Sequence, residues 1–182
     1  MVLDLFSGLG GWSKAFKDRG HQVVTIDNNP EFNPDVCIDI MDYKPDRYFD
    51  VVLASPPCTE FSKSMMPDSW NKNRTVNPDT KLVERTIEII NVIKPKYWVI
   101  ENVCGARKYF KPLLGDYKKK VGSRYLWGEF PIFDCKPVYG KWKLPPSKNR
   151  PALRSLIPYE MSLAICVSME NTKLNLHGSE KE

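Results

Sequence analysis

Cys58 lies in a segment that could present its thiol for catalysis. Residues 55–62 read SPPCTEFS and follow the apolar run 51–54, which predicts a buried strand that ends in a turn. The two prolines remove backbone donors and fix φ, so we expect a stiff loop that presents Cys58. Most free cysteines are small buried hydrophobes, however, and this segment alone leaves both roles open.

A glycine-rich turn near the N-terminus predicts a nucleoside site. The pattern predicts a strand over 2–6, a turn over 7–11 (SGLGG), a helix over 12–19 and a strand over 23–26 that ends at Asp27. Glycines let a ligand approach the backbone, and an acid at the end of the second strand can bind a ribose hydroxyl pair. The glycine spacing departs from GxGxxG, so the turn fits a dinucleotide poorly. A plain turn without a ligand is the alternative.

Other predicted strands also end in polar residues. A brief strand over 37–40 carries Asp39, which either caps a turn or lies beside the base of a ligand. A helix over 81–93 leads to a strand over 97–100 that ends at Glu101. Ligands of open parallel sheets bind at the carboxyl ends of the strands, so we expect Asp27, Cys58 and Glu101 to share one edge.

The remaining segments are less informative. The polar segment 62–80 contains aromatic and basic residues, which suit nucleic acid and equally suit a mobile surface loop. The pattern further predicts a helix over 107–114, a solvated basic run at 118–120, edge or hairpin strands at 124–127 and 131–133, and a helix after Pro158.

Composition sets broad limits. The 182 residues fit one domain, for which we expect a catalytic unit over 1–170 and a polar tail over 171–182. A net charge of +5 permits a phosphate-bearing partner without requiring one. Five scattered cysteines without a CxxC pair argue against a disulfide framework or a zinc cluster, so we expect no metal and a reducing, cytoplasmic location. Nothing in the sequence indicates a leader or a membrane segment.

Taken together, these segments resemble the cytosine-specific (carbon-5) DNA methyltransferase family. The matches are residues 4–11 (DLFSGLGG), Asp27, residues 39–40, residues 56–58 (PPC), residues 101–103 (ENV) and a closing segment over 154–165. The resemblance implies an α/β fold: a single-domain, doubly wound, mostly parallel sheet of the S-adenosylmethionine-dependent methyltransferase type.

The resemblance also implies S-adenosyl-L-methionine as the cofactor. Asp27 would bind the ribose hydroxyls, and Pro57 would pack near the sulfonium. The full set of cofactor-binding residues implied in this way is Phe6, Ser7, Gly8, Leu9, Gly10, Gly11, Asp27, Asn28, Asp39, Ile40 and Pro57.

The catalytic residues implied are Cys58 and Glu101. Carbon 5 of cytosine is a poor nucleophile, so the Cys58 thiolate would first attack carbon 6 while Glu101 donates a proton to ring nitrogen 3. The target base would have to leave the DNA stack to be reached, which makes DNA with a flipped cytosine the expected partner.

Two features depart from the family pattern. The family's Gln-x-Arg-x-Arg segment is absent, and Arg124, Arg150 and Arg154 are candidates to replace it. The interval from 103 to 154 is too short for a large target-recognition region. Sequence reading would then be minimal, come from short loops, or be supplied by a partner chain or by self-association. Two alternatives follow: methylation of RNA or a free cytosine nucleotide, and a non-catalytic S-adenosylmethionine-binding partner subunit.

Overall fold

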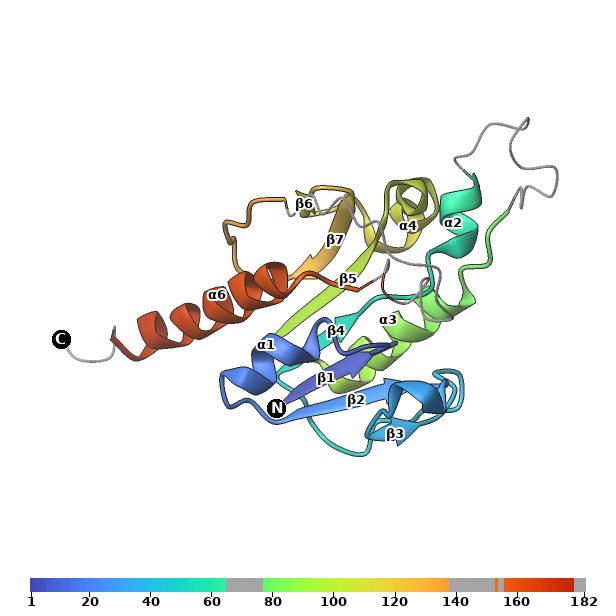
Figure 1. Ribbon diagram of the computed structural model, residues 1–182. Helices are drawn as coiled ribbons and strands as arrows, with labels where there is room; N and C mark the ends of the chain where they lie inside the picture. The colour runs from blue at the N-terminus through green and yellow to red at the C-terminus, as the bar shows by residue number, and fades with distance from the viewer. Residues whose placement is uncertain (65–76, 138–152, 154–155, 179–182) are drawn as a thin grey trace.

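A seven-stranded sheet forms the centre of the computed structural model (Figure 1), which describes residues 1–64, 77–137, 153 and 156–178, the stretch 173–178 by its backbone alone. The strand order is β3-β2-β1-β4-β5-β7-β6, and only β7 runs antiparallel to its neighbours. This arrangement confirms the predicted mostly parallel α/β sheet. The strands are β1 (Val2–Leu5), β2 (Val23–Asp27), β3 (Val36–Cys37), β4 (Val51–Ala54), β5 (Tyr97–Val103), β6 (Lys119–Val121) and β7 (Arg124–Glu129).

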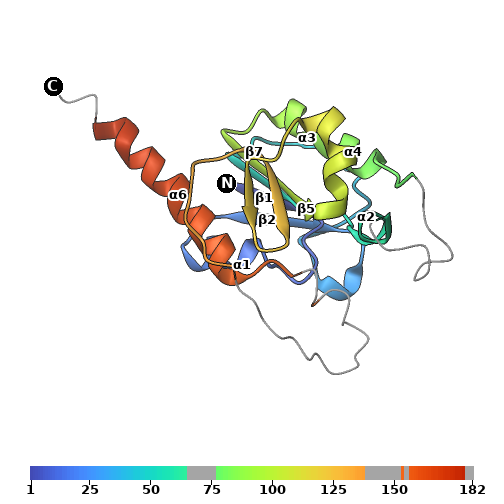
Figure 2. The same cartoon turned by 90° about the horizontal axis from the view of Figure 1, so that it is seen from above.

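Helices cover both faces of the sheet. Helices α1 and α6 lie on one face, and α3 and α4 lie on the other with α2 beside them (Figures 1 and 2). The helices are α1 (Ser13–Asp18), α2 (Thr59–Ser64), α3 (Lys81–Ile93), α4 (Arg107–Leu114) and α6 (Tyr159–Gly178), with short 3₁₀ turns η1 (Pro30–Phe32) and η2 (Cys104–Ala106). Among the residues that the structure describes, no helix is both long and apolar enough to cross a membrane.

Two apolar cores follow from the alternation of side chains along the strands. Leu3 and Leu5 of β1 pack on the α3 side, with Ile89. Leu53 of β4 packs on the other side, with Phe16 of α1. Successive strand residues point to opposite faces, so a central strand covered on both faces is apolar throughout, as the run 51–54 is.

Helix α3 begins and ends where the sequence predicts. Thr80 is the N-cap residue, and Oδ1 of the preceding Asp79 accepts a hydrogen bond of 2.9 Å from the backbone N–H of Lys81, the first residue of the helix. At its other end Lys94 has a left-handed φ of 50°, and Pro95 follows, which prevents the helix from continuing.

The edge of the sheet differs from the expectation in one place. Residues 131–133 form no strand; instead the ring of Phe133 lies 6.1 Å from that of Phe130, within the α6-side core. On its outer side β7 pairs antiparallel with β6, which includes part of the basic run expected to be a solvated surface.

Other elements differ in length. Strand β5 continues three residues beyond Ile100 to Val103, because it pairs with β7 along Glu101↔Leu126 and Val103↔Arg124. Helix α6 continues past Asn171 to Gly178, into the segment expected to be a polar tail. The expected aromatic and basic residues of the 62–80 segment, at positions 65–76, lie outside the described residues, as does most of the connector before Pro158.

Candidate active site

The glycine-rich turn is held against the end of β2. The backbone N–H of Gly8 donates a hydrogen bond of 2.9 Å to Oδ2 of Asp27. The other carboxylate oxygen of Asp27 accepts from the Asn29 N–H, also at 2.9 Å. Asp27 therefore joins the first and second strand ends, at the edge where the sequence predicts a ligand.

The turn leaves room for a ligand beside its backbone. Phe6, Gly8 and Gly10 all have left-handed φ values, between 50° and 75°, which tightens the chain directly after β1. A Cβ added at Gly10 would meet no atom within 4 Å, so the turn is open on that side. Each Asp27 oxygen retains a second lone pair, which suits the hydroxyl donors of a ribose.

The remaining predicted cofactor residues divide by exposure. Leu9, Asn28 and Pro57 are exposed, whereas Ser7 is buried. Asp39 is exposed, and its Oδ1 accepts from the Met41 N–H at 2.9 Å, so it caps a turn. The side chain of Ile40 is buried in the α3-side core, and this position can offer only its backbone to a ligand.

Gly11 is approached closely by the C-terminal part of the chain. A Cβ at this position would lie 2.6 Å from the backbone nitrogen of Ile157, closer than real atoms come. Nearby, Ser162 of α6 donates a hydrogen bond of 2.6 Å to the backbone oxygen of Trp12. The segment that precedes α6 is therefore docked on the glycine turn, although Arg154 and Ser155 lie outside the described residues.

The Cys58 loop is fixed by the end of the neighbouring strand. Asn102 of β5 is buried, and its Nδ2 donates a hydrogen bond of 3.0 Å to the backbone oxygen of Pro56. Cys58 directly precedes α2, and its carbonyl accepts from the Ser62 N–H at 2.9 Å. The thiol thus sits at the start of a helix, half-buried, on a loop that two prolines and Asn102 hold in place.

Glu101 is buried among three polar neighbours. It is 5% exposed, and its Oε1 lies 3.1 Å from Nη1 of Arg124. The Ser55 hydroxyl hydrogen-bonds to the carboxyl group and itself accepts from Nε1 of Trp12 at 3.0 Å. Burial raises the pKa of Glu101 above its ordinary value, although Arg124 and Ser55 oppose this.

Cys58 and Glu101 interact electrostatically. Burial raises the pKa of the Cys58 thiol, and the negative charge of Glu101 raises it further, while a hydrogen bond from Ser62 acts in the opposite direction. Burial and the charge on Glu101 therefore both favour the protonated thiol. The two groups are therefore arranged so that protonation of one favours ionisation of the other.

Three arginines were considered as replacements for the missing Gln-x-Arg-x-Arg segment, and the structure describes one of them, Arg124. It faces Glu101 because Glu101 pairs with Leu126 across the β5–β7 ladder, which places Arg124 diagonally opposite on the same face. Its Nη2 also donates a hydrogen bond of 2.7 Å to the backbone oxygen of Leu156. Arg150 and Arg154 lie outside the described residues.

Sequence reasoning missed Trp12, Ser55 and Asn102 as supports of the site. All three lie inside or next to segments that were singled out, at residues 4–11, 55–62 and 101–103. The signal was the polar side chain of Ser55 directly after β4 and that of Asn102 near the end of β5. The partner of each depends on the order of the strands, which the sequence alone does not give.

A cavity lies beside this site, next to the end of β5. Its volume is about 420 Å³, and it lies next to η2, α4 and β7. Its lining includes the cationic side chains Arg107, Lys108 and Lys111 and the aromatic rings of Tyr109 and Tyr117. It begins at Cys104, directly after the Glu101–Val103 segment, and does not include Cys58 or Asp27.

The family model described as "C-5 cytosine-specific DNA methylase" matches residues 1–112, which contain the glycine turn, Asp27, Cys58 and Glu101. The chain belongs to this family. Arg124 and the docked segment before α6 lie beyond the matched part.

Individual relatives match over part of their length. The protein named "Probable DNA (cytosine-5)-methyltransferase" of Frog virus 3 is 39% identical over 114 residues, 56% of this chain and 52% of the relative. "Type II methyltransferase M.XorII" of Xanthomonas oryzae is 32% identical over 127 residues, 57% of this chain and 28% of the relative. The chain thus spans about half the length of the first and under a third of the second.

Among solved structures, the Dnmt2 methyltransferase of S. pombe aligns with 82% of this chain and 57% of its own, at 18% identity and a TM-score of 0.43.

Proposed function

We propose that this chain transfers a methyl group from S-adenosyl-L-methionine to carbon 5 of cytosine in DNA, through a covalent adduct with Cys58. The observation that carries the proposal is the placement of Cys58 on the loop directly after β4, which Asn102 of the neighbouring strand β5 holds through its hydrogen bond to Pro56, while the buried Glu101 lies next to Asn102 on the same strand. Family membership and the names of the relatives support the choice of reaction and substrate.

The glycine turn suits the methyl donor. Bound there, S-adenosyl-L-methionine would supply an electrophilic methyl group on a sulfonium. Asp27 would accept hydrogen bonds from the ribose hydroxyls through the lone pairs that Gly8 and Asn29 leave free. Leu9, Asn28 and Pro57 would line the exposed side of the same site.

Cys58 would act as the nucleophile. As the thiol loses its proton, sulfur forms a bond to carbon 6 of the cytosine, and the ring electrons move toward nitrogen 3. The start of α2 and the Ser62 hydrogen bond favour the ionised sulfur. Carbon 5 would then take the methyl group, which leaves the donor as a neutral thioether. Loss of the carbon-5 proton to solvent would expel the Cys58 thiolate, and nitrogen 3 would return its proton to Glu101, which restores the ring.

Glu101 would stabilise the attacked ring. Its raised pKa favours the protonated acid, which can donate a hydrogen bond and then a proton to nitrogen 3. Arg124 and Ser55 fix the direction of the carboxyl group. Protonation of Glu101 also removes the charge that raises the pKa of Cys58, so arrival of the base would promote thiolate formation.

DNA is the proposed partner. The cations and rings beside η2 and α4 lie next to the end of β5 and suit a phosphate backbone and bases. Residues 104–129 form η2, α4, β6 and β7, which belong to the fold itself. Target recognition would therefore come from a partner chain, a second copy or a part of the protein outside the described residues.

The experiment is a transfer assay with labelled methyl donor on duplex DNA, RNA and cytosine nucleotide. We expect label in DNA from the wild-type chain, background signal from Cys58→Ala, and wild-type signal from Cys37→Ala, a matched exposed cysteine on β3. Unchanged activity in Cys58→Ala would sink the proposal. Methyl transfer to RNA or to the nucleotide, without transfer to DNA, would support the alternative substrate instead.

A further inference from the structure

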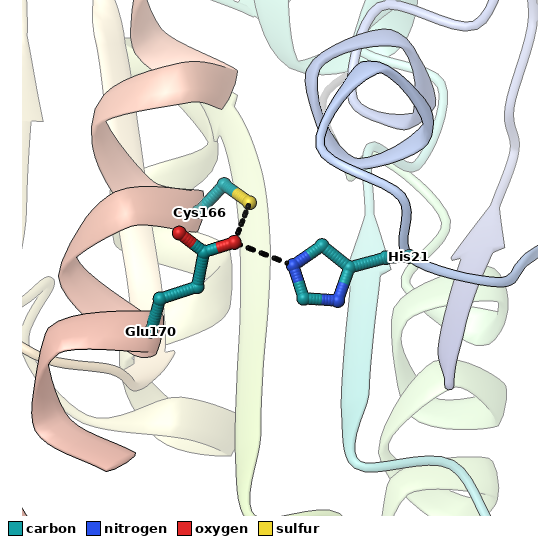
Figure 3. A group of neighbouring side chains, drawn as sticks. All are labelled: His21, Cys166 and Glu170. Carbon is teal, nitrogen blue, oxygen red and sulfur yellow. Dashed lines mark hydrogen bonds and ion pairs between the residues drawn. The ribbon is translucent and has the colours of Figure 1, made fainter. Parts of the chain in front are cut away.

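A second group of reactive side chains lies at the opposite end of the sheet from Cys58. His21 precedes β2, and Cys166 and Glu170 belong to α6; Figure 3 shows the three pointing toward one another. Nε2 of His21 lies 2.8 Å from Oε1 of Glu170, and Sγ of Cys166 lies 3.8 Å from the same oxygen. One donor atom from each residue lies within 4.8 Å of the others.

The fold fixes this arrangement from both sides. Cys166 and Glu170 are four residues apart on α6, so they share one face of the helix. The backbone N–H of His21 donates to the carbonyl of Phe16 at 3.0 Å, and its ring packs 5.7 Å from the Phe16 ring. Because α1 packs directly against α6, the His21 ring is brought to that face.

We propose that His21, Cys166 and Glu170 bind a zinc ion. An imidazole nitrogen, a thiolate and a carboxylate oxygen are the three donor types that zinc takes in proteins, and three protein ligands leave the fourth tetrahedral position to water. On binding, the thiol proton of Cys166 passes to solvent as the sulfur–zinc bond forms.

An unpartnered hydroxyl in the same place supports a bound ion with its water. The three residues line a small cavity of about 30 Å³, together with Tyr97 of β5. Tyr97 is 8% exposed, and its hydroxyl has no hydrogen-bond partner among the described residues. A cavity of this size holds one water molecule, and a buried hydroxyl normally has a partner. A water on the fourth position of the zinc ion would provide one.

Arg19 gives the simpler alternative, an ion-pair network without metal. Its Nη2 lies 2.5 Å from Oε2 of Glu170, and Nε lies 3.1 Å from Oε1. This network satisfies the carboxylate, but it leaves the Tyr97 hydroxyl unpartnered. The two arrangements differ in the effect of Arg19, because its charge repels a divalent cation and supports a plain ion pair.

The zinc ion would fasten α6 to the turn between α1 and β2. The segment before α6 contacts Gly11 and Arg124, so the fastening would hold the C-terminal part of the chain in register with the sheet. The inference does not depend on methyl transfer, since its residues lie at the other end of the strands.

The test is metal analysis of the purified full chain after chelation and reconstitution with zinc, with calorimetry for affinity and cobalt absorption for thiolate coordination. The variants are His21→Gln, Cys166→Ser and Arg19→Met, with Cys104→Ser, an exposed cysteine outside the cluster, as the control. Circular dichroism of each variant verifies folding, and His21→Gln, at a part-exposed position, is the mildest change.

We expect one zinc per chain in the wild type and in Cys104→Ser, with a sulfur-to-cobalt absorption band and a rise in Tm. His21→Gln and Cys166→Ser should weaken binding at least tenfold and remove the Tm rise. Arg19→Met should bind zinc more tightly. The inference is overturned if the wild type retains no zinc, if either ligand variant binds as the wild type does, or if Arg19→Met weakens binding.

Discussion

Arg124 of β7 lies 3.1 Å from the buried carboxylate of Glu101 and 2.7 Å from the backbone oxygen of Leu156. One side chain thus connects the predicted acid of the site with the segment that precedes α6. The side chains of Arg124 and Glu101 are 18% and 6% exposed, so water screens their pairing only weakly.

Removal of this guanidinium should cost stability as well as activity. We expect Arg124→Met to lower the free energy of unfolding by about 2 kcal/mol, because a hydrogen-bonded charge loses its buried partner. The double variant Arg124→Met with Glu101→Gln should recover part of that loss. Urea unfolding measures both. Arg47→Met, which breaks an exposed pair with the adjacent Asp46, is the control and should change little. Equal effects of the two arginine substitutions would contradict the account.

The ionisation of Cys58 should respond to Glu101. Because the carboxylate charge contributes to raising the pKa of the thiol, Glu101→Gln should lower that pKa and speed alkylation of Cys58 at a given pH. The rate of iodoacetamide labelling across pH, read at position 58 by mass spectrometry, measures this. Methyl transfer should fall at the same time, since glutamine cannot donate a proton to the base. A thiol pKa that stays the same or rises in Glu101→Gln would count against the coupling.

Asp27 should control affinity for the methyl donor. Asp27→Ala removes the acceptor for Gly8 and Asn29, and we expect the Kd for S-adenosyl-L-methionine to rise at least about tenfold, roughly 1.4 kcal/mol. Asp27→Asn keeps one acceptor oxygen, so its Kd should lie between those of the wild type and Asp27→Ala. Calorimetry measures all three, with the exposed Asp46→Asn as the control. An unchanged Kd in Asp27→Ala would remove Asp27 from the cofactor site.

Asp4 should give the fold a distinctive pH dependence. It is 1% exposed, accepts a hydrogen bond from the Ser13 hydroxyl, and burial raises its pKa to about 7. Between pH 4 and pH 7 the folded chain therefore keeps a proton that the unfolded chain has lost. The resulting stability is present below pH 4 and is lost as the pH rises through 7, by on the order of 4 kcal/mol.

Asp4→Asn should remove this pH dependence. The difference in unfolding free energy between the wild type and Asp4→Asn should fall from pH 5 to pH 7.5, because only the wild type loses the buried proton. Urea unfolding at the two pH values measures the difference, and the exposed Asp116→Asn serves as the control. A difference that does not change with pH would show that Asp4 is ionised in the folded chain throughout.

The sequence predicted the elements whose signals are local. Helix α3 is an example, because its broad apolar face and the Pro95 that ends it lie within one short stretch. The placement of Asp27 and Cys58 at one edge was also predicted from strand ends, since parallel strands present their carboxyl ends together; Glu101 lies within β5, two residues before its end, because β5 continues along β7.

Features that depend on pairing between distant segments could not be predicted in this way. Arg124 was one of three candidates because its position opposite Glu101 depends on the register of β5 against β7. His21 and Cys166 are 145 residues apart, so nothing in the sequence pattern indicated that the fold brings them together. Phe133 lies in an apolar stretch that suggested a strand, yet it serves the α6-side core from an irregular segment.

The most direct measurement uses duplex DNA in which the target cytosines carry fluorine at carbon 5, incubated with the chain and S-adenosyl-L-methionine. Fluorine cannot leave as a proton does, so the adduct between enzyme and base persists. The account predicts a covalent protein–DNA species whose attachment point maps by mass spectrometry to Cys58 and which is absent in Cys58→Ala. No adduct on substrate that the wild type methylates in its unfluorinated form, or attachment at another residue, would contradict it.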